Sequence, residues 1–184
     1  MRKIILNLAI SLDGYIEGAN GEYDWCIMDD DMGFDTFFNK FDAAFYGRKS
    51  YQMFGKQNPE TFSNDAEREA YEQMKNIKKY VFSDTLKEVG KGDELINSQN
   101  LLEKVNELKN QQGKDIWLFG GSSLVTTFVN LDLVDEYELG LHPIILGAGK
   151  PLFIDIKKRE YLKLVDSKPT KSGVVMLTYQ PNKI

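Results

Sequence analysis

Short apolar runs alternate with helical stretches over residues 1–130, and this alternation limits the fold more than any other feature of the sequence. The runs predicted as strands are 3–10, 43–47, 78–83, 94–97 and 115–119. The stretches predicted as helices are 33–41, 48–54, 64–77, 100–113 and 122–130. Three more apolar runs follow with no helix between them, at 134–146, 160–166 and 173–180. This pattern predicts one α/β domain over residues 1–184, with a mixed, mainly parallel sheet and antiparallel strands at the C-terminus.

The segment 100–113 carries the clearest helical pattern. Asn100 and Glu103 have the spacing of a capping box, and Gly113 is placed to end the helix. Apolar residues recur at helical spacing between these ends, at Leu101, Leu102, Val105 and Leu108. A second stripe with this spacing consists of Phe34, Phe37, Phe38 and Phe41. We expect both stripes to pack into the core.

The single cysteine and the single histidine exclude several classes of site. One thiol, Cys26, cannot form an internal disulfide, which fits a reducing, cytoplasmic compartment. A zinc site of the usual kind needs several Cys or His ligands, so we expect no metal site. The formal net charge of -5 argues against a general nucleic-acid binder. The apolar runs are too short to span a membrane, and Asn7 interrupts the first of them, so we expect neither membrane insertion nor a signal peptide.

Two glycines interrupt the apolar sequence at 115–125. Gly120 and Gly121 follow a predicted strand, and Ser122 and Ser123 begin a predicted helix. The first N–H groups of a helix have no partner within the helix and carry a partial positive charge. Glycines here let a ligand approach the backbone, and the serines add hydroxyl donors, so the segment suits a phosphate or pyrophosphate. The alternative is a plain structural turn, because neither standard phosphate-binding motif is present.

Two other predicted strands also end in groups that can bind phosphate. Arg48, Lys49 and Ser50 follow Gly47 at the end of one strand, and Ser83 ends another. Ligands of open α/β sheets bind at the carboxyl ends of strands. A dinucleotide with a phosphorylated ribose needs a cationic pocket besides its pyrophosphate seat, and the planar donors of arginine suit that pocket. Alternatively, Arg48 and Lys49 are solvated residues of a first helical turn, although a cation there opposes the helix dipole.

Several segments together resemble one known superfamily. They are LAISLDGYIEG, DAAFYGRKSY, YVFS, IWLFGGSSLV and LVDEYELGLHPIILGAGKPLF, in this order along most of the chain. This ordered set resembles the dihydrofolate-reductase-like superfamily, and most closely its branch containing the reductase domain of riboflavin biosynthesis. The resemblance implies a three-layer α/β fold with a mixed sheet, a reductase activity that uses NADPH as hydride donor, and a homodimer.

The resemblance also implies which residues contact NADPH. Those at the nicotinamide are Ala9 and Ile16, on either side of a mobile loop. Those at the adenosine end are Gly47, Arg48, Lys49, Ser50 and, near the 2′-phosphate, Ser83. Those at the pyrophosphate are Gly120, Gly121, Ser122, Ser123 and Leu124.

The substrate side of the resemblance leaves alternatives open. The riboflavin-type branch implies a pyrimidine such as 5-amino-6-(5-phosphoribosylamino)uracil, a true dihydrofolate reductase would hold a pterin with one acidic residue, and a non-catalytic NADPH-binding protein is the third possibility. Asp30 and Asp31 are the candidates for that residue and for a carboxylate that relays a proton. They could equally cap the helix that follows. Trp25 and Phe34 are candidates to bind the heterocyclic substrate, or else anchor a loop and the core.

Three further residues have both a functional and a structural interpretation. His142 has no obvious nucleophile partner in the sequence, which favours a structural role. Lys150 follows a Gly-Ala-Gly run and could meet a substrate phosphate or lie in water. Cys26 has no activating neighbour in the sequence, so we expect an inert thiol.

Overall fold

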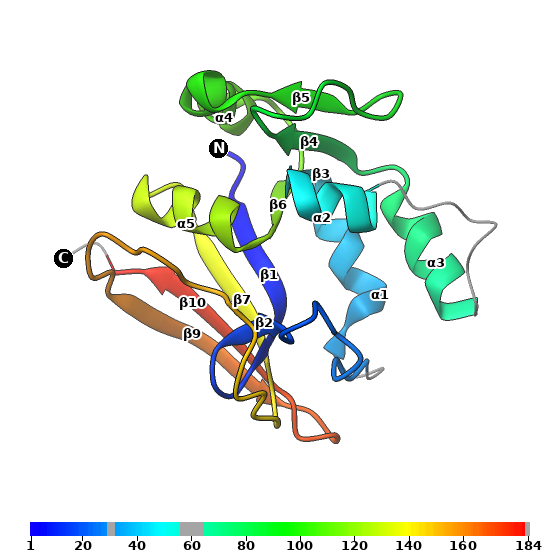
Figure 1. Ribbon diagram of the computed structural model, residues 1–184, viewed down its shortest axis with the longest axis vertical. Coiled ribbons are helices and arrows are strands. Elements are labelled where there is room, and N and C mark those ends of the chain that lie inside the picture. The colour runs from blue at the N-terminus through cyan, green and yellow to red at the C-terminus, as the bar shows by residue number, and fades with distance from the viewer. Residues whose placement is uncertain (29–31, 56–64, 183–184) are drawn as a thin grey trace. The chain divides into compact units, whose positions relative to one another are not determined.

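The computed structural model describes residues 1–28, 32–55 and 65–182 (Figure 1). The described residues belong to two compact units. The first consists of Met1–Arg2 and Asp35–Gly121, and the second of Lys3–Phe34 and Ser122–Ile184. Each unit has its own strands and its own buried apolar side chains. None of the helices in the described ranges is long and apolar enough to cross a membrane.

The first unit is a parallel α/β arrangement. Its strands are β3 (Phe41–Gly47), β4 (Lys78–Phe82), β5 (Glu94–Ile96) and β6 (Asp115–Gly120), in the order β5-β4-β3-β6. Its helices are α2 (Arg48–Ser50), α3 (Asp65–Met74) and α4 (Leu101–Asn110), with α1 (Phe34–Phe37) at the boundary and a π-helical turn at Tyr51–Gly55. Each pairing among these strands is parallel, so their carboxyl ends lie at one edge of the unit.

Helix α4 buries a narrower stripe than the sequence predicts. Leu101, Val105 and Leu108 are buried, but Leu102 is 47% exposed and faces away from the core. The predicted capping box is wrong: the side chain of Asn100 makes no cap, and the side chain of Asn97 accepts from the Asn100 N–H instead. The helix ends at Asn110, before the predicted end at Gly113. A separate 3₁₀ turn at 98–100 therefore precedes α4, and its own cap stabilises the entry.

The phenylalanine stripe is divided between three elements. Helix α1 ends at Phe37, Phe38 lies in a 3₁₀ turn, and Phe41 begins β3, so the predicted helix over 33–41 is too long. Phe37 and Phe41 are both buried, and their rings lie 5.0 Å and 6.1 Å from that of Trp117. The prediction that this stripe belongs to the core is confirmed for these described rings.

The second unit combines parallel and antiparallel pairing. Its strands are β1 (Ile4–Ser11), β7 (Glu136–His142), β9 (Leu162–Pro169) and β10 (Val175–Pro181), in the order β1-β7-β10-β9, and its helix is α5 (Ser122–Asn130). Strands β1 and β7 run parallel, whereas β10 lies antiparallel between β7 and β9 (Figure 1). The predicted mixed, mainly parallel α/β class with antiparallel C-terminal strands is therefore confirmed.

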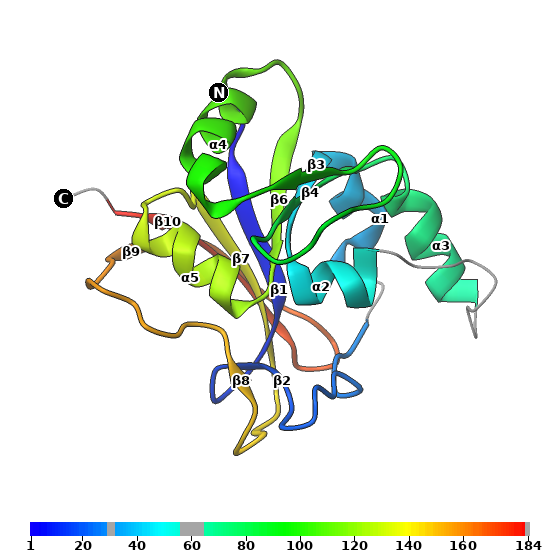
Figure 2. The same ribbon diagram turned by 45° about the horizontal axis from the view of Figure 1, so that its top comes forward.

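Two short strands of the second unit were not predicted. β2 (Tyr15–Glu17) and β8 (Lys150–Pro151) pair antiparallel as a small separate sheet (Figure 2). Strand β1, predicted at 3–10, is not buried along its whole length, because Asn7, Leu8 and Ala9 are only half-buried. Asn7 donates from Nδ2 to Oε2 of Glu138 on β7, at 3.0 Å, so the centre of β1 carries a polar contact across the sheet.

Candidate functional site

Three neighbouring strands of the first unit end side by side. In the register, Gly47 of β3 lies opposite Phe82 of β4, and Tyr46 lies opposite Gly120 of β6. The residues that come next along these strands therefore share one edge of the unit: Arg48, Ser83 and Gly121. The sequence predicted these three positions separately as phosphate-compatible, and the strand register brings them to adjacent strand ends.

The part of the chain that the structure describes does not neutralise the two cations of this edge. Arg48 and Lys49 are exposed, and Arg48 donates from Nη1 to Oε1 of Gln52 at 3.1 Å. Within the described ranges, neither side chain meets a carboxylate. Helix α2 starts directly after Gly47, which supplies no side-chain cap, and the half-buried Ser50 ends it. Two uncompensated positive charges beside an uncapped helix start suit an anionic group.

Ser83 is held in place by the turn that it begins. Its Oγ accepts from the backbone N–H of Thr85 at 3.2 Å and of Leu86 at 3.0 Å. Its hydroxyl proton can still be donated, either to Oγ1 of Thr85 at 3.4 Å or to a ligand. The hydroxyl is therefore oriented by the backbone without losing its capacity as a donor.

The glycine pair at the end of β6 has unusual backbone geometry. Gly120 has a φ of 99°, a region that side-chain-bearing residues rarely adopt, and the peptide bond between Gly120 and Gly121 is cis. Helix α5 begins one residue later, at Ser122, and has no acidic residue in its first turn. No carboxylate in the first turn of α5 therefore offsets the partial positive charge at the start of this helix. Such a helix start suits an anion.

The hydroxyl of Ser122 is committed to the protein. Its Oγ donates to the carbonyl oxygen of Pro151 at 2.7 Å, and the residue is fully buried. The prediction that both serines add hydroxyl donors for a ligand is therefore wrong for Ser122, which can offer only its backbone N–H. Ser123 is exposed, and Leu124 is buried as part of the apolar face of α5.

The loop that was expected to be mobile is fastened within the second unit. Asp13 accepts hydrogen bonds from Oγ of Ser11 at 2.7 Å and from the backbone N–H groups of Gly147 at 2.8 Å and Leu146 at 3.1 Å. The Ser11 hydrogen bond and, after it, the two backbone N–H groups hold the pKa of Asp13 below its usual value. The hydrogen bonds from Leu146 and Gly147 to the Asp13 carboxylate, named here the Asp13 latch, therefore hold the loop to the segment just before β8.

The predicted nicotinamide residues lie on two elements of the second unit. Ile16 is in β2, whose neighbour Tyr15 pairs with Pro151, the residue that accepts from Ser122. Strand β8 thus links Ile16 to the start of α5. Ala9 is on β1, opposite Gly140 of β7.

Trp25 and His142 support each other at the end of β7. The Trp25 indole donates to the carbonyl oxygen of Glu22 at 3.2 Å, and its ring packs edge-on against His142 at 5.3 Å. His142 is buried, with Nδ1 at 2.9 Å from the carbonyl oxygen of Gly140. These contacts fit the structural interpretation of His142 and show Trp25 anchoring its loop.

The protein contacts of Lys150 and the burial of Cys26 support a structural interpretation of both residues. Lys150 lies 3.3 Å from Oε1 of Glu17, as an ion pair across the β2–β8 sheet. Burial, with a further contribution from Asp24, raises the pKa of the Cys26 thiol to about 11. A thiol with so high a pKa is almost entirely protonated at neutral pH, which agrees with the inert cysteine predicted.

The substrate-side predictions fall largely outside the described residues. Asp30 and Asp31 lie outside the described ranges, and so does the side chain of Phe34. Their predicted roles in binding and catalysis stay predictions.

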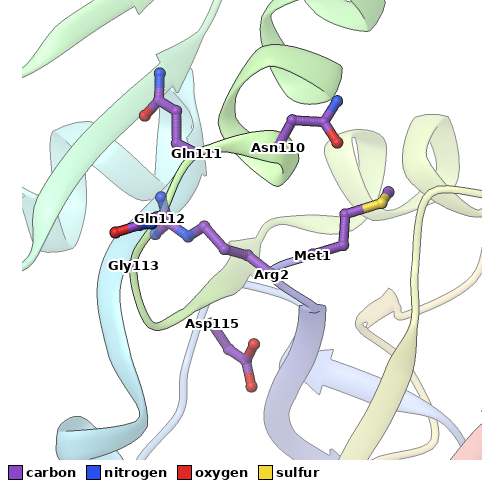
Figure 3. Close-up of a pocket in the computed structure, with 7 residues that line it drawn as sticks. All are labelled: Met1, Arg2, Asn110, Gln111, Gln112, Gly113 and Asp115. Atoms are coloured by element: carbon purple, nitrogen blue, oxygen red, sulfur yellow. The ribbon is translucent and has the colours of Figure 1, made fainter.

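A hollow of about 380 Å³ lies elsewhere in the first unit (Figure 3). Its lining consists of Met1, Arg2, Asn110, Gln111, Gln112, Gly113 and Asp115. The buried Arg2 guanidinium donates to the carbonyl oxygen of Lys114 at 2.5 Å and to the Asp42 carboxylate. The hollow borders Asp115, the first residue of β6, about 17 Å along the strand from Gly120 at roughly 3.3 Å per residue. The hollow is therefore remote from the ends of β3, β4 and β6. At the hollow, the hydrogen bonds of Arg2 hold the N-terminal residues in place.

Comparison with known proteins identifies the family to which the chain belongs. The sequence profile of the RibD C-terminal domain matches residues 2–176. The chain belongs to the RibD C-terminal domain family. Relatives of this RibD C-terminal domain include the uncharacterized protein YyaP of Bacillus subtilis (strain 168), which is 54% identical over 181 residues, covering 98% of this chain and 96% of YyaP.

Solved structures agree on the fold. A protein of Shewanella sp. PV-4 named for riboflavin biosynthesis superposes with a TM-score of 0.78 and 24% identity, covering 98% of this chain and 99% of that one. A dihydrofolate reductase from Enterococcus faecalis, complexed with NADP(H), superposes with a TM-score of 0.67 and 14% identity, covering 98% and 97%. These likenesses confirm the dihydrofolate-reductase-like fold that the motifs predicted for this RibD C-terminal domain.

Proposed function

We propose that this RibD C-terminal domain is an NADPH-dependent reductase that transfers a hydride to a pyrimidine- or pterin-type substrate, most like 5-amino-6-(5-phosphoribosylamino)uracil. The observation that carries the proposal is the adjacency of Arg48, Ser83 and Gly121 at three neighbouring strand ends, where Arg48 and Lys49 have no carboxylate partner among the described residues. Family membership supports a reductase of the riboflavin-biosynthesis type. The NADP(H) bound to the Enterococcus faecalis relative supports the choice of cofactor.

The residues fit NADPH in chemical character. Arg48 and Lys49 supply positive charge for the 2′-phosphate, and the hydroxyl of Ser83 supplies a donor there. The start of α5, after Gly121, supplies backbone N–H groups for the pyrophosphate. When bound, NADPH supplies the hydride, and the protein binds and orients it while keeping water out. Ala9 and Ile16 are assigned to the nicotinamide end.

The substrate side is assigned by residue type. Trp25 and Phe34 would contact the heterocycle, and the carboxylate of Asp30 or Asp31 would hold the proton that the reduced nitrogen or oxygen requires. A structure from Thermotoga maritima, named as a deaminase and 5-amino-6-(5-phosphoribosylamino)uracil reductase, has a TM-score of 0.69 at 17% identity, and this chain covers 57% of it. The match to the RibD C-terminal domain family, together with the name of that structure, supports the pyrimidine as substrate. We place the activity in the cytoplasm, where a single thiol stays reduced.

The cofactor proposal is tested by Arg48→Ala. The substitution removes charge-assisted hydrogen bonds to a phosphate, so the Kd for NADPH should rise about 10- to 100-fold, while the Kd for NADH stays nearly unchanged. Titration calorimetry with both nucleotides measures this difference. Arg68→Ala, at an exposed arginine of α3, is the matched control and should change neither Kd. Equal weakening of NADPH and NADH would remove Arg48 from the 2′-phosphate.

The substrate proposal is tested by nicotinamide absorbance with two acceptors. We expect NADPH oxidation with 5-amino-6-(5-phosphoribosylamino)uracil and little with dihydrofolate. Preference for dihydrofolate would establish the alternative reductase. Tight NADPH binding without turnover of either acceptor would support a non-catalytic NADPH-binding protein.

A further inference from the structure

A tight turn follows β2 in the second unit, at residues 18–22. Gly18 donates its backbone N–H to the carbonyl oxygen of Glu22 at 2.8 Å, and Gly21 donates its own to the carbonyl oxygen of Gly18 at 3.0 Å. Gly21 has a φ of 87°, a value that favours glycine. The turn contains Asn20, the only asparagine in the sequence that precedes a glycine. Asn20 is exposed, so water reaches its side chain.

An asparagine that precedes a glycine can lose ammonia without an enzyme. The backbone nitrogen of Gly21 bonds to Cγ of Asn20, the bond between Cγ and Nδ2 breaks, and Nδ2 leaves as ammonia with the hydrogen of the Gly21 N–H. Water then opens the cyclic imide. Cleavage between Cγ and the nitrogen gives aspartate, and cleavage at the main-chain carbonyl gives isoaspartate. Glycine favours the first step because it has no Cβ beside the attacking nitrogen.

The carboxylate of Glu22 holds the amide group that must leave. Its Oε1 accepts from Nδ2 of Asn20 at 2.7 Å, and its Oε2 accepts from the backbone N–H of Asn20 at 2.8 Å. The hydrogen bond from the Asn20 side chain is the largest cause that keeps the pKa of Glu22 below its usual value, so this acceptor is ionised at neutral pH. A side chain tethered in this way samples fewer orientations and reaches the one needed for attack less often.

We propose that Asn20 is a site of spontaneous deamidation, that Glu22 slows the reaction by tethering the Asn20 amide, and that the product releases the turn that anchors Trp25. The hydrogen bond from Gly21 to Gly18 slows the reaction as well, because the attacking nitrogen must give up that hydrogen. The folded chain therefore reacts more slowly than the unfolded one, and water is the only co-reactant.

The product removes the contact that holds the turn together. An aspartate at position 20 has no N–H group on its side chain, so a second carboxylate faces Glu22 in place of a donor. Two like charges this close repel each other. The carbonyl oxygen of Glu22 accepts from the Trp25 indole at 3.2 Å, and the Trp25 ring packs against His142 at 5.3 Å. Displacement of Glu22 therefore weakens the anchor of Trp25.

Peptide mapping by mass spectrometry tests the reaction and the role of Glu22. The folded wild type, Glu22→Ala and Asp24→Ala are kept at mildly alkaline pH, and the asparagine, aspartate and isoaspartate forms of position 20 are measured over time. We expect slow conversion in the wild type and conversion about three- to tenfold faster in Glu22→Ala, because the tether is lost. Asp24→Ala removes a nearby exposed carboxylate and is the matched control, which should convert at the wild-type rate.

Asn20→Asp tests the effect of the product on the turn. In a Trp117→Phe background Trp25 is the only tryptophan, so its fluorescence reports on this loop. Asn20→Asp should make the Gly18 amide exchange several-fold faster and shift the Trp25 emission to longer wavelength, because the indole becomes more exposed to water. Asn20→Gln keeps an amide donor and is the control, which should leave both signals close to those of the parent.

Three results would overturn the proposal. The first is an Asn20 that stays unmodified in both the folded wild type and folded Glu22→Ala while the urea-unfolded chain converts. The second is an equal rate of conversion in these two folded proteins, and the third is equal Gly18 exchange in Asn20→Asp and Asn20→Gln. Circular dichroism checks that each variant is folded. None of these measurements uses cofactor or substrate, so their outcome is independent of the proposed function.

Discussion

Two tyrosines of the first unit differ in how their buried hydroxyls are satisfied. Tyr51 donates from its hydroxyl to Oδ2 of Asp93 at 2.5 Å and accepts from the Gly90 N–H at 2.7 Å. The Tyr46 hydroxyl is fully buried and has no hydrogen-bond partner among the described residues. Burial raises the pKa of Tyr46, and burial followed by the Asp93 hydrogen bond raises the pKa of Tyr51 to about 12. Both phenols are neutral at pH 7, so the contrast is one of hydrogen bonding.

Removing the two hydroxyls should therefore have opposite effects on stability. Tyr46→Phe removes an unsatisfied buried donor and should leave the free energy of unfolding unchanged or raise it by up to about 1 kcal/mol. Tyr51→Phe strips the Gly90 N–H and Asp93 of a partner and should lower it by about 1–3 kcal/mol. Urea denaturation of the two matched variants measures both effects. A clear loss of stability in Tyr46→Phe would show that its hydroxyl has a partner after all.

Residue types predicted part of the site, and long-range hydrogen bonds determined the rest. Glycine after a strand, or arginine at a helix start, is visible locally, and the parallel register then brings Arg48 and Ser83 together. The commitment of Ser122 to Pro151 was not predictable, because the acceptor is 29 residues away and lies on a strand of two residues. The hydrogen bonds to Asp13 were not predictable either, because their donors are backbone N–H groups 133 and 134 residues away.

At the scale of elements, hydrophobic periodicity was sufficient wherever an element was long. The strands and helices from β3 to α5 lie close to their predicted positions, because burial on one stripe or on both faces leaves a clear pattern. β2 and β8 were missed because each lies beside glycines that indicate a turn or loop, at Gly14, Gly18 and Gly149, whereas β5, which also has three residues, lies in a short apolar run. The helix over 33–41 was extended too far because Phe41 fits helical spacing and also the start of β3.

The hydrogen bonds from the backbone N–H groups of Leu146 and Gly147 to Asp13, the Asp13 latch, give a prediction about amide exchange. Asp13→Ala removes the acceptor for the Leu146 and Gly147 N–H groups, so these amides should exchange several-fold faster. Hydrogen–deuterium exchange with NMR detection resolves them individually. The folded-state pKa of Asp13 is lowered, so the latch is present above the usual aspartate pKa of about 3.9 and is lost as the pH falls through the lower folded value. Asp24→Ala is the control, and equal acceleration in it would contradict a specific latch.

The entry to α4 gives a second prediction at this scale. Asn97 caps the 3₁₀ turn through its side chain, whereas the Asn100 side chain makes no cap. Asn97→Ala should lower the free energy of unfolding by about 0.5–2 kcal/mol, and Asn100→Ala by much less. Thermal denaturation of the pair compares them directly. The reverse order would restore the capping box that the sequence suggested.

At the scale of the whole molecule, neither compact unit is a continuous piece of chain. The first is made from Met1–Arg2 and Asp35–Gly121, and the second from Lys3–Phe34 and Ser122–Ile184. The second unit therefore forms only when its two segments pack together, although residues 35–121 separate them in the sequence. Each unit contains one of the two tryptophans, Trp117 in the first and Trp25 in the second.

Because each unit is built from two separated segments of the chain, we expect the two units to unfold together. Trp25→Phe leaves Trp117 as a fluorescence probe of the first unit, and Trp117→Phe leaves Trp25 as a probe of the second. In each variant, the urea midpoint from tryptophan fluorescence should coincide with the midpoint from far-UV circular dichroism, because a unit assembled from separated segments loses its closure when the intervening chain unfolds. Trp117 is 8% exposed in the aromatic core, so Trp117→Phe should shift both midpoints down together. Fluorescence that changes before the circular dichroism in either variant would mean that one unit unfolds while the other persists.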